Sequence, residues 1–90
     1  MSRDKKIGQD KKMVLVEWTD ARFFPGTYNE EVIKKHKMCL FKSLGYLVSR
    51  DNTTTVLAAE SNDENEYRDI TLIPTGSIMA VRKLFTGPIV

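Results

Sequence analysis

The chain has 90 residues, of which 41% are hydrophobic and 29% are charged, and its formal net charge is +2. A chain of this length forms one small domain with a thin core, which excludes a two-domain enzyme, a doubly wound sheet and a large barrel. The composition is that of a globular protein, and no apolar run approaches the ~20 residues that span a membrane. Residues 1–12 have no apolar segment behind their charges, so we expect no signal peptide.

Charged residues are unevenly distributed along the chain. Residues 1–12 are basic, and residues 34–42 hold Lys34, Lys35, Lys37 and Lys42 without an acid. Residues 60–69 hold five carboxylates against one arginine. If folding keeps these segments apart, the domain has a basic face and an acidic face. The alternative is that they are solvated loops that keep a small protein soluble.

The first third of the chain predicts an arm, a strand and a long connection. Residues 1–12 are polar and read as a disordered basic arm. Residues 13–19 predict a strand with Val14, Val16 and Trp18 on one face, Trp18 being a core residue. Residues 20–36 predict a connection in which Asn29 caps a helix of one or two turns.

Residues 38–49 predict a long strand. Its apolar side chains fall on one face at Met38, Leu40, Leu44, Tyr46 and Val48. Gly45 lies in the middle, where a glycine weakens a strand unless the backbone must bend or bulge. We therefore expect a sharp bend at Gly45, of the kind by which a small barrel turns a corner.

The second half of the chain predicts three more segments. A turn at residues 50–52 leads to a strand over 53–59, and an acidic loop over 61–66 leads to a strand over 67–73. Residues 74–77 predict a turn with one 3₁₀ turn. Residues 78–85 fit either a helical stripe or a strand, and we favour a strand because the preceding strands need a partner at a sheet edge.

These elements predict the fold class. Many short strands separated by turn signals are typical of an all-β sandwich or barrel. At this length only a small, strongly bent five-stranded barrel fits. We therefore predict an all-β fold with a possible short helix, in one domain over residues 13–85, with a C-terminal tail over 86–90.

Residues for catalysis or metal binding are scarce. His36 is the only histidine and Cys39 the only cysteine, which excludes a histidine cluster and a cysteine zinc site. On a strand, residues three apart lie on opposite faces, so these two do not form a nucleophile pair. We therefore predict no catalytic residue, no metal and no cofactor, and a protein that is not an enzyme. The lone cysteine also suggests a reducing, cytoplasmic setting.

Two short patterns carry a resemblance. The stretch from Gly45 to Asp51 reads G-x-L-x-x-x-D and is followed by the apolar pair Val56-Leu57, and Ile78 to Val81 reads I-x-x-V. These patterns resemble the two signatures of Sm-like (LSm-type) RNA-binding proteins. Leu72-Ile73-Pro74 before a short turn and a final strand also resembles the end of Src-homology-3-like barrels.

The whole chain is also similar to small uncharacterised phage and marine environmental proteins. The similarity rests on three stretches, Trp18–Ala21, Ser43–Val48 and Ile73–Ile78, and spans about residues 13–85. It implies a phage accessory protein that works in the cytoplasm of a bacterial host.

The Sm-like resemblance implies candidate contacts to RNA bases. Thr55 stands four residues after Asp51, where Sm-like proteins usually carry a base-contacting Asn. Thr75 and Gly76 stand where an Arg-Gly pair usually precedes the last strand. With Asn52, these residues occupy two turns that can lie at one end of a bent barrel. The plainer explanation is that Asp, Asn and Thr are good turn formers.

Two functions remain open from the sequence. The first is an Sm-like RNA-binding module in a homo-oligomeric ring, whose fourth and fifth strands pair between subunits, with Lys34, Lys35, Lys37 and Lys42 contacting phosphates. In this reading we expect Tyr46, Phe23 and Phe24 to pack in the core rather than stack on bases. The second is a phage or accessory protein-interaction barrel without a nucleic-acid role, whose acidic segment 60–69 and basic segment 34–42 pair between subunits.

Overall fold

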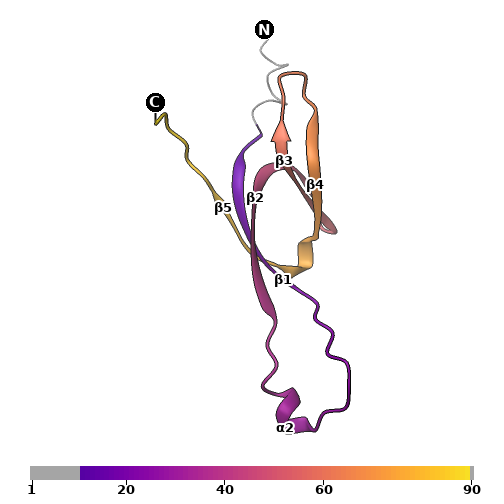
Figure 1. The fold of residues 1–90 in the computed structure, drawn as a ribbon. Coiled ribbons are helices and arrows are strands. Elements are labelled where there is room, and N and C mark those ends of the chain that lie inside the picture. Colours follow the sequence, from indigo (N-terminus) through magenta and orange to yellow (C-terminus); the bar gives the residue numbers. More distant parts are fainter. Residues whose placement is uncertain (1–10, 90) are drawn as a thin grey trace.

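The computed structural model describes residues 11–89, so the predicted arm lies outside the described residues except for Lys11 and Lys12. The described part is mostly β, with one short helix and one 3₁₀ turn (Figure 1). In chain order the elements are β1 (Met13–Asp20), α2 (Glu30–Ile33), β2 (Cys39–Arg50), β3 (Thr54–Ser61), β4 (Tyr67–Pro74), η2 (Thr75–Ser77) and β5 (Ile78–Lys83). Each predicted strand is present close to its predicted ends, and the last segment is a strand.

The strands form a single antiparallel sheet in the order β4-β3-β2-β1-β5. β4 pairs only with β3, and β5 pairs only with β1, so these two strands are the edges of the sheet. Because the edges do not pair with each other, the sheet is not closed, and closure into a barrel stays a prediction. The edge strand β4 is interrupted at Asp69, whose φ of 59° is left-handed.

A thin core lies on one face of the sheet. Val14 and Val16 of β1 are 3% and 0% exposed, and they contact the equally buried Leu57 of β3 and Ile73 of β4. This confirms the predicted inward face of the first strand. Trp18 packs at the rim of this core, where its indole Nε1 donates a hydrogen bond to Ser43 Oγ at 3.0 Å.

The apolar face predicted for the long strand is its outer face. Cross-strand partners share a face, and β1 residues Val14 and Val16 pair with Gly45 and Ser43 of β2. Leu40 and Leu44 therefore point away from the core, and they are 50% and 65% exposed. The apolar side chains of β2 do alternate as predicted, but the pairing of β2 with β1 places Gly45 and Ser43 on the inner face beside Val14 and Val16.

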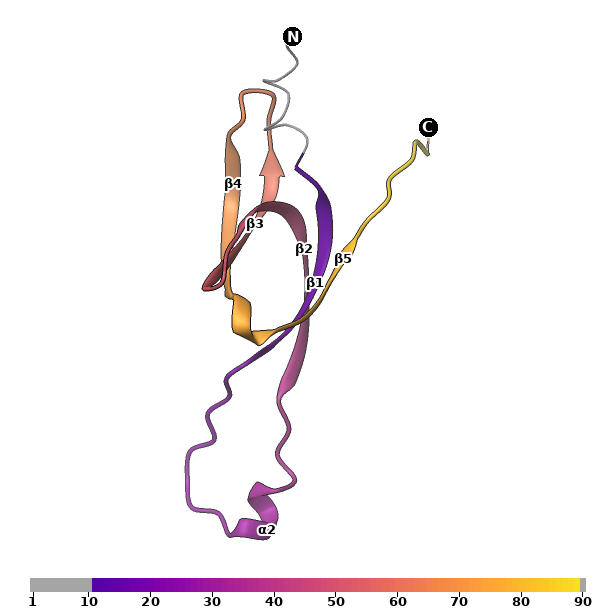
Figure 2. The same ribbon diagram turned by 180° about the vertical axis from the view of Figure 1, so that it is seen from behind.

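Gly45 allows β2 to approach β3 closely. A Cβ atom at Gly45 would lie 2.8 Å from the carbonyl oxygen of Ala58 and 3.3 Å from Leu57 Cβ, so no larger residue fits without a shift. Two residues later the register slips and leaves Val48 without a partner on β3. A tight approach and a bulge together bend the strand, and β2 curves over strongly in both views (Figures 1 and 2).

The connection between β1 and β2, residues 21–38, is named the long loop below. It extends well beyond the sheet and carries α2 near its far end (Figure 2). As predicted, Asn29 caps this helical turn, because its side-chain oxygen accepts a hydrogen bond from Val32 N at 2.9 Å. With the long loop, the molecule measures 63 Å along its longest axis and 31 Å along the next.

The close approach at Gly45 yields a stability prediction. Gly45→Ala places a methyl group against backbone atoms of β3, so we expect the free energy of unfolding to fall by about 1–3 kcal/mol. Gly76→Ala is the matched control, because its Cβ would meet nothing within 4 Å. Urea denaturation of the three proteins measures the difference. Equal stability of the two variants would contradict the proposed role of Gly45.

Candidate functional site

The turn between β2 and β3 lies against η2 and joins three of the predicted site residues. The Asp51 carboxylate accepts hydrogen bonds from Thr54 N at 2.7 Å and Thr53 N at 2.8 Å. Thr75 of η2 donates its hydroxyl to the Asp51 carbonyl oxygen at 2.8 Å, and its backbone N–H donates to Thr53 O at 3.0 Å. These bonds fasten the turn to the start of η2.

Thr55 completes this cluster from inside. Its hydroxyl lies 2.9 Å from the Thr75 hydroxyl. Since the Thr75 proton is donated to Asp51, Thr55 is the donor in this pair. Thr55 is 0% exposed, so in this structure it has no surface for a base to contact.

The predicted base contacts therefore divide into two groups. Asp51, Thr55 and Thr75 come together as the sequence suggested, but their polar groups are engaged with one another and with the backbone. Asn52 and Gly76 are exposed on the two adjoining turns. Base contact by these residues stays a prediction.

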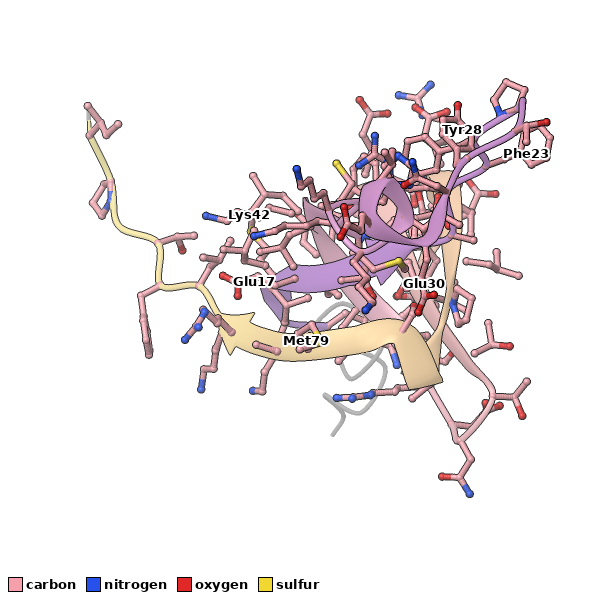
Figure 3. The ribbon with its side chains drawn as sticks, turned by 90° about the horizontal axis from the view of Figure 1, so that it is seen from below. Glu17, Phe23, Tyr28, Glu30, Lys42 and Met79 are labelled. Atoms are coloured by element: carbon pink, nitrogen blue, oxygen red, sulfur yellow. The ribbon has the colours of Figure 1, made fainter. Side chains whose placement is uncertain are left out.

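The four predicted phosphate contacts also separate. Lys34, Lys35 and Lys37 lie together and exposed at the end of the long loop. Lys42 lies on β2, opposite Glu17 of β1. In Figure 3 Lys42 and Glu17 lie on the side of the molecule away from Phe23 of the long loop. The predicted phosphate contacts therefore lie on two different parts of the molecule, and their role stays a prediction.

Stacked rings hold the long loop in shape, which the sequence analysis missed. The Phe24 and His36 rings stack with their centroids 4.0 Å apart and an interplanar angle of 1°. Tyr28 meets His36 edge-on at 5.4 Å, and its hydroxyl donates to Pro25 O at 2.7 Å. Arg22 lies over the Phe24 ring at 4.9 Å. The only hint in the sequence is the clustering of aromatic residues on both arms of one loop.

The expected core packing is wrong for Phe23 and Phe24, because Phe23 is 86% exposed and Phe24 stacks on His36 in the long loop rather than in the core. Tyr46 is half-buried. His36 packs against Phe24, and Cys39 is exposed at the start of β2, so nothing pairs these two as nucleophile and base.

An open groove of about 630 Å³ lies along the outer side of the β3–β4 hairpin. Its walls come from the hairpin and from β2: Tyr46, Ala59, Glu60, Ser61, Asn62, Glu66 and Arg68. Glu60 pairs with Arg68 at 2.7 Å, and Asn62 Nδ2 donates to Glu66 Oε1 at 2.8 Å. These carboxylates serve to shape the hairpin. Within residues 11–89 no three His, Cys, Asp or Glu side chains are grouped to hold a metal ion.

No protein-family model, curated protein or solved structure matches the chain. Among the described residues, no helix has the length and apolar character needed to cross a membrane.

The turn cluster yields a prediction on pH. Hydrogen bonds from Thr54 N and Thr53 N hold the pKa of the Asp51 carboxyl below its ordinary value of 3.8. A carboxyl whose pKa is lower in the folded state contributes stability above its unfolded-state pKa, and this contribution is lost as the pH falls through the folded-state pKa. We therefore expect wild type to exceed Asp51→Asn in stability near neutral pH, and the difference to shrink at acid pH below about 3.8.

Urea denaturation of both proteins across this pH range measures the effect. Glu31→Gln is the control, because the Glu31 carboxylate makes no hydrogen bond or ion pair within the described residues. A wild-type advantage over Asp51→Asn that stays constant with pH would contradict the assignment.

Proposed function

We propose that the protein is a small Sm-like β-barrel module that assembles into a homo-oligomeric ring and binds single-stranded RNA. The barrel type is supported by the strand order β4-β3-β2-β1-β5, by the bend of β2 at Gly45 and by the turn η2 before β5. Because η2 joins the end of β4 directly to the start of β5, the two edge strands meet at one end of the sheet.

The proposal depends above all on the two unpaired edges and their opposite charges. β4 begins at the acidic hairpin turn, and its neighbourhood carries Glu60, Asp63, Glu64, Glu66 and Asp69. β5 ends at Lys83, and the preceding Arg82 donates its Nε–H to Glu17 Oε2 of β1 at 3.2 Å. An unpaired edge offers a row of N–H and C=O groups to another strand, so edges of opposite charge favour pairing with each other.

The strand directions suit a ring. In Figure 1 β4 runs downward from its turn with β3, and β5 runs upward, away from η2. Rotating a second copy about the long axis therefore places its β4 antiparallel to β5 of the first. The acidic turn of one copy then lies beside Arg82 and Lys83 of the next. A head-to-tail contact of this kind uses two different surfaces and closes into a ring when the rotation closes.

The assembly is tested by removing one donor from the open edge. Leu84 N donates to Met13 O at 3.0 Å, and N–H groups of an antiparallel strand alternate in direction, so the Lys83 N–H points to the open side. Lys83→Pro should convert a closed oligomer into a monomer, as measured by light scattering. Phe85→Pro, just beyond the strand, is the matched control and should leave the oligomer intact. A wild-type protein that stays monomeric at all concentrations would refute the ring.

RNA binding is tested by light scattering on the protein as it elutes from a size-exclusion column, at moderate salt and with a uridine-rich oligonucleotide. We expect the RNA to co-elute with the oligomer. We also expect binding to weaken with salt, with a slope near −0.7 per phosphate neutralised. Absence of complex at low salt would refute this part of the proposal.

A second candidate is a phage or accessory interaction module that assembles without nucleic acid. It is favoured by the large apolar side chains on the outer surface, of which Leu44, Leu72 and Met79 are each more than 60% exposed. The internal engagement of Thr55 and Thr75 favours it too. An intact oligomer that ignores RNA under all salt conditions would favour this candidate over the first.

A further inference from the structure

Phe23 is an aromatic side chain that the fold leaves in solvent. It lies in the long loop, away from the core, and is 86% exposed. Figure 3 shows Phe23 at the outer side of the loop. Exposing a large ring forgoes the stabilisation that burial would give, so its position is not explained by packing within one chain.

The backbone on both sides of Phe23 is held in place. Its neighbours are Arg22 and Phe24, and Phe24 stacks on His36 from the other arm of the loop. Arg22 Nη1 donates to Lys37 O at 2.8 Å, a bond that ties together residues fifteen positions apart. Arg22 also covers the Phe24 ring. A ligand that meets the exposed ring therefore finds it already positioned, which lowers the entropy lost on binding.

The loop that carries this ring is rich in cations, and Lys35 and Lys37 flank His36, which stacks on Phe24 across the loop. Residues 21–38 carry Arg22, Lys34, Lys35 and Lys37 against Glu30 and Glu31. Glu30 forms an ion pair with Lys34, in which its carboxylate lies 3.6 Å from Lys34 Nζ. Figure 3 shows Glu30 apart from Phe23. Lys35 and Lys37 make no ion pair within residues 11–89, so their charges remain open to an outside anion.

An exposed ring and unpaired cations on the two tied arms of one loop suit one class of ligand. Single-stranded nucleic acid combines flat, unpaired bases with a regularly spaced negative backbone, and proteins bind it by stacking bases on aromatic side chains beside basic residues. A duplex hides the faces of its bases, and an acidic peptide does not carry a flat group next to each of its charges.

We infer that the end of the long loop is the RNA-contacting element of this protein, with Phe23 stacking on an unpaired base while Lys35 and Lys37 contact the adjoining phosphates. The inference rests on the proposed RNA binding and specifies where it occurs. The RNA contact then lies on the long loop, which precedes β2 in the chain. It does not lie at the turns around Asp51 and Thr75, whose polar groups bond to one another and to the backbone.

The test measures binding of fluorescein-labelled oligouridine by fluorescence anisotropy over a range of salt. Phe23→Ala should weaken binding about 5- to 150-fold, the range expected for one stacked base. Lys35→Ala with Lys37→Ala should make the salt slope shallower by about 1.4, because two phosphate contacts are lost. All three side chains are exposed, so the variants should fold.

Two matched controls test whether the loss of binding belongs to this loop or would follow from removing any exposed ring or lysine. Phe85→Ala removes an equally exposed ring, 85% accessible, from the chain after β5. Lys12→Ala removes an exposed lysine just before β1, at the end of that strand away from the long loop. Both should bind like wild type. Light scattering on every variant checks that the oligomeric state is unchanged.

The outcomes distinguish the two proposals. If wild type binds oligouridine but the Phe23 and Lys35/Lys37 variants keep its affinity and salt slope, the location is wrong and RNA binding stands. If the controls weaken binding as much as the loop variants, the contact is a diffuse charge effect, and the inference again fails. If wild type binds no RNA at low salt, the proposed function itself is refuted, and the inference falls with it.

Discussion

The contact between Gly45 and the backbone of Ala58 is the constraint on which the architecture depends. A straight β2 of twelve residues would carry its far end away from the rest of the sheet. The bend instead returns the β2–β3 turn to the end of β4, where Thr75 fastens it to η2. η2 then directs β5 back to β1. The absence of a side chain at Gly45 thus allows the bend that brings the last strand back to β1.

The same bend accounts for the small size of the core. Only one face of a curved five-stranded sheet is enclosed, and its enclosed volume is filled by a few aliphatic side chains and the hydroxyl pair of Thr55 and Thr75. The opposite face carries leucine and methionine into solvent. A domain of this length buries a limited fraction of its surface, so several large apolar side chains stay exposed on this outer face.

Much of this fold was predictable from the sequence because the signals are local. Alternation fixed the inward face of β1, Asn29 fixed the start of α2, and proline with glycine marked the turn before β5. The inward face of β2 was not predictable, because it depends on pairing with Val14 and Val16 across the sheet. The stack of Phe24 on His36 was missed for the same reason: it joins residues twelve positions apart whose meeting depends on how the loop closes. The polarity of the turn cluster suggested a binding site. Its hydrogen bonds fasten the turn to η2, a role that the sequence did not indicate, and base contact by these residues stays a prediction.

The left-handed backbone at Asp69 affects how the open edge can be used. Protein chains with straight, exposed edge strands are prone to indefinite stacking into fibrils. At Asp69 the backbone of β4 is left-handed, although the strand keeps one register with β3 on both sides, and the portion from Ile70 to Pro74 is similar in length to β5. A partner strand longer than this portion meets the irregular section and the acidic turn beyond it. An irregular edge is a poorer template for continuous pairing with other chains than a regular one, so the left-handed residue Asp69 disfavours fibril growth along β4.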